Sequence, residues 1–123
     1  MSSDERFKLI PVTAVPGLVE VRVYDELHEH VRNQHQEISR TFLDTESFEQ
    51  AIESAISDPC LVYSSYNNSY LFVNEQTTNR AGHPICVPVK VVANSNSGYV
   101  KTVFFGTARQ TKDLVFRRED SDE

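Results

Sequence analysis

The second half of the chain consists of short apolar runs that are separated by turn sequences. Between Cys60 and Phe105, runs rich in valine, leucine, isoleucine and aromatic residues alternate with polar segments, and the clearest turn lies from Asn94 to Gly98. Runs of this kind, bounded by Asn, Ser and Gly, are typical of antiparallel strands joined by hairpins. Pro88 lies inside one run and predicts an edge strand or a bulge, because proline has no amide hydrogen to donate. The pattern predicts a meander of about four strands.

The pattern between residues 25 and 58 is helical instead. Two apolar stripes recur at helical spacing: Leu27, Val31, Ile38 and Phe42, then Phe48, Ile52, Ala55 and Ile56. Asp44 offers a helix cap before the second stripe, and Asp58-Pro59 ends it. Residues 7–10 and 18–24 look like further strands. We therefore expect an α+β fold, in which two N-terminal helices pack on an antiparallel sheet of about four strands.

Length and composition indicate one domain over residues 1–123, with frayed ends at 1–6 and 118–123. The 123 residues are 39% hydrophobic and 24% charged, which is ordinary for one globular domain. No apolar run approaches the roughly 18 residues that span a bilayer, and the first residues do not read as a signal peptide. The expected location is therefore cytoplasmic, with no membrane association.

Charge and cysteine content bear on whether the chain can bind nucleic acid, a metal or a cofactor. The net charge is −6, but Asp4, Glu5 and the tail 119–123 supply six acidic groups, so residues 6–118 balance 12 basic against 12 acidic residues. Such a body leaves room for a local cationic cleft. Cys60 and Cys86 have no metal-ligand spacing and are expected to be free thiols. We expect no metal, because His28 and His35 are too far apart on a helix to share one ion and no cysteine or carboxylate completes a ligand set. We expect no nucleotide cofactor, because the chain has no glycine-rich phosphate loop.

A segment from His30 to Ile38 and two later strand residues are candidates for proton-transfer chemistry. His30 lies at the border of the apolar stripe, where a partly desolvated imidazole acts as a general acid or base; the alternative is a core-edge histidine bonded to backbone. His28, Arg32 and His35 lie at i, i+4 and i+7 and form either a cationic face for phosphate or a solvated surface. Lys90 and Thr102 flank the hairpin turn and are expected to be near cross-strand neighbours that hold a phosphate. The alternatives are an edge-guarding lysine and ordinary strand propensity.

These segments together resemble a known family. The resemblance is carried by "H-V-x-x-x-H-x-E-I" from His30, an Asp-Pro junction before "L-V-Y-S", then "V-x-V-K" and "G-Y-V-K-T-V-F-F". Their order is similar to small barnase-like ribonuclease domains, in particular the phage-associated and toxin-type members of the barnase–EndoU–colicin–RelE group. The resemblance covers roughly residues 18–106. It implies RNA cleavage by attack of the 2′-hydroxyl on the adjacent phosphate, without a metal.

The resemblance also implies roles for individual residues. The catalytic set would be His30, His35, Glu37, Lys90 and Thr102, with Arg32 and Tyr63 contacting the RNA substrate. Four positions depart from the family pattern: Gln34 replaces an arginine, Gln36 a proline, Phe104 an alanine and Phe105 a tyrosine. Loss of a cation and of a phenol weakens phosphate binding and acid catalysis.

Three functions fit the sequence. The first is a metal-independent endoribonuclease-like domain, a toxin or defence component restrained by a protein partner such as an antitoxin or immunity protein. The second is a non-catalytic acidic binding protein of the immunity or antitoxin type, which inhibits a basic nuclease by charge complementarity. The third is a non-catalytic domain of a larger assembly. Clustered His, Lys and Thr favour the first, and the acidic surface favours the second.

Overall fold

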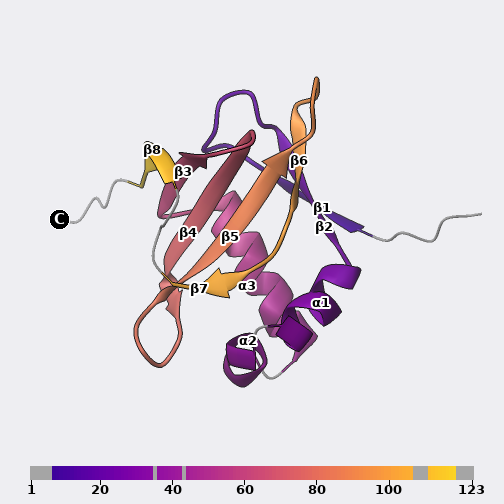
Figure 1. Cartoon of the computed structure of the whole chain (residues 1–123), viewed down its shortest axis with the longest axis vertical. Coiled ribbons are helices and arrows are strands. Elements are labelled where there is room, and N and C mark those ends of the chain that lie inside the picture. The colour runs from indigo at the N-terminus through magenta and orange to yellow at the C-terminus, as the bar shows by residue number, and fades with distance from the viewer. Residues whose placement is uncertain (1–6, 35, 43, 107–110, 119–123) are drawn as a thin grey trace, which may run out of the picture.

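The structure is a computed structural model that describes residues 7–34, 36–42, 44–106 and 111–118. In chain order its elements are β1 (Phe7–Pro11), β2 (Glu20–Tyr24), α1 (Glu26–Gln34), α2 (Gln36–Thr41), α3 (Thr45–Ser57), β3 (Leu61–Ser65), β4 (Ser69–Thr78), β5 (Pro84–Val91), β6 (Ser97–Val100), β7 (Phe104–Phe105) and β8 (Thr111–Arg117). The strands form one twisted sheet, and the helices lie together on one side of it (Figure 1).

The sheet has eight strands and mixed direction. Its order is β1-β2-β6-β5-β4-β3-β8, and the short β7 pairs with β5 beside β6. All neighbours are antiparallel except β2 and β6, which run parallel. This parallel pair joins the N-terminal hairpin β1–β2 to the strands that follow the helices. Residues far apart in the sequence thereby become neighbours across the middle of the sheet.

The expected fold class is therefore wrong, because the sheet differs from the prediction in its number of strands, their direction and their place in the chain. A barnase-like arrangement of two N-terminal helices on about four antiparallel strands is replaced by an eight-stranded mixed sheet, in which two strands precede the helices. The runs at 7–10 and 18–24 do form strands, but periodicity alone does not tell which strands they pair with. A further strand that the sequence pattern does not predict, β8, pairs with β3 and extends the sheet beyond it.

The helices bury both expected apolar stripes against the sheet. Leu27, Val31, Ile38 and Phe42 are all buried, as are Phe48, Ile52, Ala55 and Ile56. Their core partners on the strands are Ile10, Val21, Val23, Val62, Phe72, Ile85, Val87, Val89 and Val100. The first stripe spans two helices, α1 and α2, on either side of residue 35, rather than one.

The cap of α3 forms as the sequence indicates. The Asp44 carboxylate accepts a hydrogen bond from the Ser47 amide at 2.8 Å, which satisfies an amide that the first turn of a helix leaves unpaired. No helix in the described part of the chain is both long and apolar enough to cross a membrane.

Because side chains alternate along a strand, the residues between the core positions point to the other side of the sheet. We call this side the open face, since α1, α2 and α3 all pack on the opposite side; in Figure 1 the open face points toward the viewer and α3 lies behind it. Part of the open face carries a small apolar cluster of Leu71, Val73 and Cys86, with Leu61, Tyr63 and Phe104 packed against them.

Pro88 is accommodated inside the sheet, contrary to the expectation of an edge strand or a bulge. β5 lies between β4 and β6, and its register with β4 passes through the Leu71–Pro88 pair without a shift. The Pro88 carbonyl accepts from the Lys101 amide at 2.9 Å. The nitrogen of a strand residue points the same way as its carbonyl, so the missing donor faces the segment 101–103, where β6 has ended and β7 has not begun.

Gly98 allows β6 to lie close against β5. A Cβ atom at this position would be 2.7 Å from the Lys90 carbonyl oxygen and 3.0 Å from a Val89 methyl carbon. The first of these contacts involves backbone, which cannot turn away as a flexible side chain can. At Gly106 an added Cβ would meet nothing closer than 3.4 Å, an ordinary contact with the Phe104 ring.

Gly98→Ala is therefore expected to lower the free energy of unfolding by about 1–3 kcal/mol, the usual cost of overpacking. Gly106→Ala is the matched control and should be neutral or stabilising by up to about 1 kcal/mol, because it restricts only the unfolded chain. Urea denaturation of both variants measures the difference. Equal stability of the two variants would contradict the close β5–β6 packing.

Candidate nucleic-acid interface

A continuous row of side chains crosses the open face perpendicular to the strands. The register pairs Leu9 with Arg22, Arg22 with Tyr99, Tyr99 with Lys90, Lys90 with Ser69, Ser69 with Ser65, and Ser65 with Thr111. Neighbouring strands lie about 4.8 Å apart, so the two cations flank Tyr99 at close range. The far half of the row consists of hydroxyl side chains.

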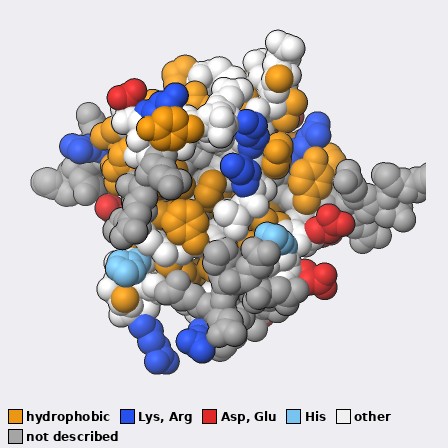
Figure 2. Space-filling model, viewed as in Figure 1, with side chains coloured by type: hydrophobic (Ala, Val, Ile, Leu, Met, Phe, Trp, Pro, Cys, Tyr) orange, Lys and Arg blue, Asp and Glu red, His pale blue; other side chains and the backbone are white. Residues whose placement is uncertain are grey.

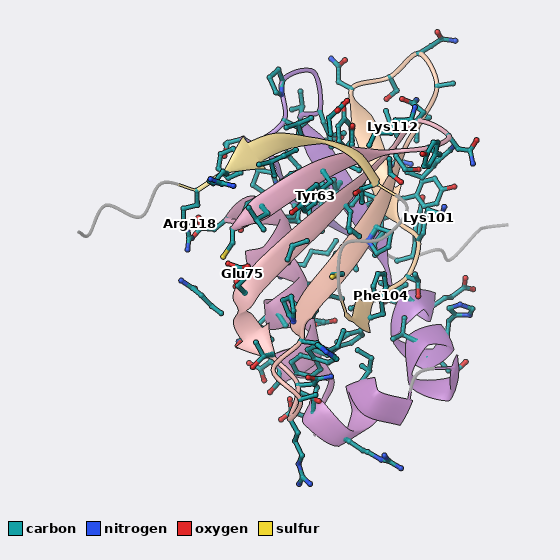
Figure 3. All side chains as sticks on the ribbon, turned by 60° about the vertical axis from the view of Figure 1, so that its left-hand side comes forward. Tyr63, Glu75, Lys101, Phe104, Lys112 and Arg118 are labelled. Atoms are coloured by element: carbon teal, nitrogen blue, oxygen red, sulfur yellow. The ribbon has the colours of Figure 1, made fainter. Side chains whose placement is uncertain are left out.

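A second row runs beside the first, two residues away along β1 to β5 and three residues away along β8, where the register shifts. It contains Phe7, Tyr24, Pro88, Leu71, Tyr63 and Leu114. Lys101 joins it next to Pro88 through the backbone hydrogen bond described above. Tyr63, Lys101, Phe104 and Lys112 are labelled on this side of the sheet in Figure 3.

Cations on the open face lie against aromatic rings. The Arg22 guanidinium carbon is 5.1 Å from the centroid of the Phe7 ring, and Arg22 also donates to the Tyr24 hydroxyl at 3.5 Å. The Lys112 ammonium is 5.0 Å from the Tyr66 ring centroid. Both pairs are within the range of a cation–π attraction. The hydrogen bond with Tyr24 raises the pKa of Arg22 above its ordinary value.

We define the open-face patch as these charged and aromatic residues together: Arg22, Lys90, Lys101, Lys112, Phe7, Tyr24, Tyr63, Tyr66, Tyr99 and Phe104. Figure 2 shows Lys, Arg and apolar side chains over the middle of this face, with Asp and Glu side chains at its margin. In β2 and β4 the acidic residues that point this way, Glu20 and Glu75, lie beyond the two rows.

The helical side of the molecule carries the opposite charge. α1 contributes Glu26 and Glu29, and α3 contributes Glu46, Glu49 and Glu53. Lys8, which points to this side, is bonded to Glu53 at 2.7 Å, and this hydrogen bond raises the pKa of Lys8. The negative net charge therefore does not describe the open face, because the acidic residues of α1 and α3 lie on the other side of the sheet from Arg22, Lys90 and Lys101.

A hollow of about 290 Å³ opens next to the rows, between the β3–β4 turn, the segment after β6, β7 and the start of β8. Leu71, Pro88 and Phe104 supply its apolar surface, while Lys101 and Thr102 also line it. The turn is held in place by Lys90, whose ammonium donates to the Asn67 carbonyl. Asn67 and Asn68 have φ of 61° and 58°, a conformation that asparagine adopts more readily than most residues.

Three of the residues expected in the site share the open face. Lys90 lies in the first row and Tyr63 in the second, and Thr102 lines the hollow. Lys90 and Thr102 are not cross-strand neighbours, however, because Lys90 pairs with Tyr99. The hairpin closes between Val92 and Ser97, which shifts the register from the one that a turn over residues 94–98 implies.

The remaining expected residues lie on or beside the helices. His30 is exposed on α1, so its expected position at the edge of the core is wrong. The side chains of Arg32 and Glu37, and residue His35 altogether, lie outside the described residues. His30 makes no described contact with Lys90, Thr102 or Tyr63, and the expected catalytic set is not assembled among the described side chains.

Sequence reasoning missed most of the open-face patch. Arg22, Tyr99 and Lys101 were treated as ordinary strand residues, and Lys112 lies in a segment that was assigned to no strand. Their signal is present in the sequence as the polar and aromatic positions that alternate with valines, as in Glu20-Val21-Arg22-Val23-Tyr24. The alternation shows that these side chains share one face of a strand, but only the strand order places them on one surface.

The described residues hold no group of three or more His, Cys, Asp or Glu side chains suited to a metal ion. Cys60 and Cys86 are free thiols, as expected. Cys86 is buried in the small apolar cluster of the open face, and burial raises its pKa to about 11. Cys60 is half-buried and donates to the Asn74 side chain at 3.5 Å.

At pH 8 iodoacetamide should therefore modify Cys60 well before Cys86, because the reactive thiolate is scarce below the pKa and Cys86 is also inaccessible. Mass spectrometry of the peptides measures the order. The variant Cys60→Ser isolates Cys86, which should react rapidly only in denaturant. Fast modification of Cys86 in this variant under native conditions would show that the cluster is open to solvent.

Comparison with protein-family models, with curated proteins and with solved structures gives no match for this chain. The resemblance to barnase-like ribonucleases remains a hypothesis from short motifs. The function is therefore argued from the geometry of the open face.

Proposed function

We propose that the chain binds single-stranded RNA across the open face of its sheet. The observation that carries this proposal is the open-face patch itself, in which four cations lie among exposed and half-buried rings on a surface that none of the helices α1, α2 and α3 covers. Proteins that bind single strands combine cations for the backbone with aromatic rings for the bases. Flat sheets with exposed aromatic residues bind RNA in this way.

The row Arg22–Tyr99–Lys90 supports this mode of binding at the level of single groups. The two cations on either side of the ring would neutralise phosphates, while Tyr99, which is 36% exposed, offers a face for stacking. The Lys90 ammonium uses one donor on Asn67, and an ammonium has three. It therefore holds the turn and retains donors for a phosphate.

Hydroxyl side chains favour RNA over DNA at this surface. Ser65 and Thr111, both half-buried, continue the first row beyond Lys90, while Ser69 between them is buried and donates to the Asn67 carbonyl. A hydroxyl both donates and accepts hydrogen bonds, and the 2′-hydroxyl of RNA does the same. A strand whose phosphates lie along Arg22 and Lys90 would bring its sugars toward these residues.

Cleavage of the bound RNA is the further step that the sequence motifs predict. Lys90 and Thr102 would then hold the scissile phosphate, and His30 or Glu37 would have to supply proton transfer. The structure supports the phosphate-binding part, since Lys90, Thr102 and Tyr63 share the open face. Proton transfer would require His30 of α1 or Glu37 of α2 to reach the RNA that is bound on the open face.

A second candidate function is recognition of a basic protein partner, the antitoxin or immunity role. The acidic residues of α1 and α3 favour it, because they lie on the side of the sheet opposite the open-face patch. Such a surface steers a cationic protein by long-range attraction. RNA binding and partner binding would then use different sides of the molecule.

Lys101→Gln tests the binding proposal. We expect about a tenfold loss of affinity for a short single-stranded RNA, and a decrease of about 0.7 in the slope of log affinity against log salt, the value for one phosphate contact. Fluorescence anisotropy at several salt concentrations measures both quantities.

The control is Arg80→Gln, which removes the same charge from an exposed loop position between β4 and β5 and should leave affinity unchanged. A DNA strand of the same sequence tests the contribution of the 2′-hydroxyl. Failure of the folded wild-type protein to bind any RNA would reject the proposal and leave the partner-binding candidate.

Cleavage is tested by incubating the wild-type chain with RNA in excess chelator, beside His30→Ala and Lys90→Ala. The motif hypothesis predicts cleavage by the wild type alone, because each variant removes a group that the mechanism requires. An RNA with a single 2′-deoxy substitution at the cut site should resist cleavage. Tight binding without cleavage would restrict the function to RNA binding, and equal cleavage by His30→Ala would exclude His30 from the chemistry.

A further inference from the structure

A second hollow lies between α2 and the loop that joins β4 to β5. It has a volume of about 750 Å³ and is lined by Arg40, Thr41 and residues 78–81; we call it the arginine pocket. In Figure 1 the two segments lie at the lower end of the molecule, and Figure 2 shows Lys and Arg side chains gathered there. The volume is within the range of small-molecule pockets.

The backbone that carries Arg80 is fixed by a closed turn. Asn79 is buried; its amide donates to the His83 carbonyl at 3.1 Å, and its side-chain oxygen accepts from the His83 amide at 2.9 Å. The Gly82 amide donates to the Asn79 carbonyl at 3.0 Å, and Gly82 has φ of 85°, which glycine adopts without strain. The exposed side chain of Arg80 therefore starts from a turn of defined geometry.

Arg40 has an equally well-anchored backbone on the other side of the arginine pocket. Ile38 and Phe42 lie two residues before and after it and are buried, and the Phe42 amide donates to the Ile38 carbonyl at 2.9 Å. The Phe42 ring stacks on Phe105 of β7, with 5.9 Å between the ring centroids. The Arg40 side chain is exposed. An anion that binds between the two arginines would therefore not have to order a loop, which lowers the cost of binding.

The lining residues favour an anion with two negative charges. Among the described residues that line the arginine pocket none is acidic, whereas Arg40 and Arg80 each carry a positive charge. Two like charges in one pocket repel each other, and an anion between them removes this repulsion. The planar fork of a guanidinium matches the oxygens of a phosphate. A phosphomonoester carries close to two negative charges at neutral pH, whereas each internal linkage of an RNA strand carries only one.

We propose that the arginine pocket binds a phosphomonoester between Arg40 and Arg80. The phosphate would belong to a free nucleotide or to the 5′ end of an RNA strand, because both present the same chemical group. The pocket lies beside the start of β5 at Pro84, whereas Lys90 of the open-face patch lies near the other end of that strand. This inference therefore concerns a separate site and does not depend on RNA binding at the open face.

The site is tested by isothermal titration calorimetry at pH 7.5, with adenosine 5′-monophosphate and with adenosine as its uncharged match. The wild-type chain should bind the monophosphate but not adenosine. Arg80→Gln and Arg40→Gln should each lose about tenfold or more in affinity, because hydrogen bonds to charged groups contribute more than neutral ones. Arg40→Lys should retain part of the affinity, because it keeps the charge and loses the planar fork.

Two controls separate the site from general charge effects and from folding. Arg117→Gln removes the same charge from an exposed position at the end of β8 and should leave the affinity for the monophosphate unchanged. The melting temperature of each variant shows whether the fold is intact. Arg80→Gln changes an exposed loop residue and should melt like the wild type, so its loss of affinity would report on the site itself.

A comparison of two RNA strands by fluorescence anisotropy identifies the source of the phosphate. One strand carries a 5′-phosphate and the other a 5′-hydroxyl. A higher affinity of the phosphorylated strand that is lost in Arg80→Gln would assign the pocket to an RNA end, and monophosphate binding without this difference would assign it to a free nucleotide. The 5′-hydroxyl strand should bind Arg80→Gln as it binds the wild type.

Three results would overturn the proposal. The first is that the wild-type chain binds no monophosphate and gives no advantage to the phosphorylated strand. The second is that adenosine binds as tightly as its monophosphate, and the third is that both arginine-to-glutamine variants keep the wild-type affinity. Each of these results leaves the RNA-binding proposal untouched, since that proposal is judged by the 5′-hydroxyl strand and Lys101→Gln.

Discussion

The packing of α1, α2 and α3 against one side of the sheet is the interaction on which the rest of the structure depends. The buried residues of these helices interlock with Ile10, Val21, Val62, Phe72 and their neighbours to form the main core. Because this burial supplies most of the apolar area removed from water, it also fixes which side of each strand faces inward. The opposite side has no helix to cover it, and its polar, charged and aromatic residues remain available to a ligand.

The parallel pairing of β2 with β6 gives the open face its composition. It places Arg22 of the N-terminal hairpin beside Tyr99 of the C-terminal hairpin, although more than seventy residues of chain separate them. Gly98 makes this arrangement possible, because a side chain there would collide with the backbone of β5. The absence of a side chain at Gly98 therefore allows Arg22, Tyr99 and Lys90 to lie side by side. Because side chains alternate along each strand, these cations lie on the side of the sheet opposite the acidic residues of α1 and α3.

The sequence predicted a helix or strand correctly where a single periodic pattern of apolar residues defines the element. The two apolar stripes, the Asp44 cap and the runs that became β1 to β5 needed only nearest-neighbour physics. The register of the last hairpin did not follow, because Asn94 adopts φ of 59° and the loop closes between Val92 and Ser97. This shift separates Lys90 from Thr102. His30 was placed at the core edge from a helical wheel, whereas it is exposed on a helix that ends at Gln34.

The sequence by itself determined the two apolar helical stripes, the apolar runs that became β1 to β5 and the cap of α3, and it indicated that the two cysteines are free thiols. These properties depend on alternation and spacing over a few residues, which any pairing of the strands preserves. Only the tertiary structure decided that the sheet is mixed, that β5 and its proline are central, and that cations from four separate segments share one face. Strand order depends on which distant surfaces pack best around a common core, and a local pattern carries no information about that choice.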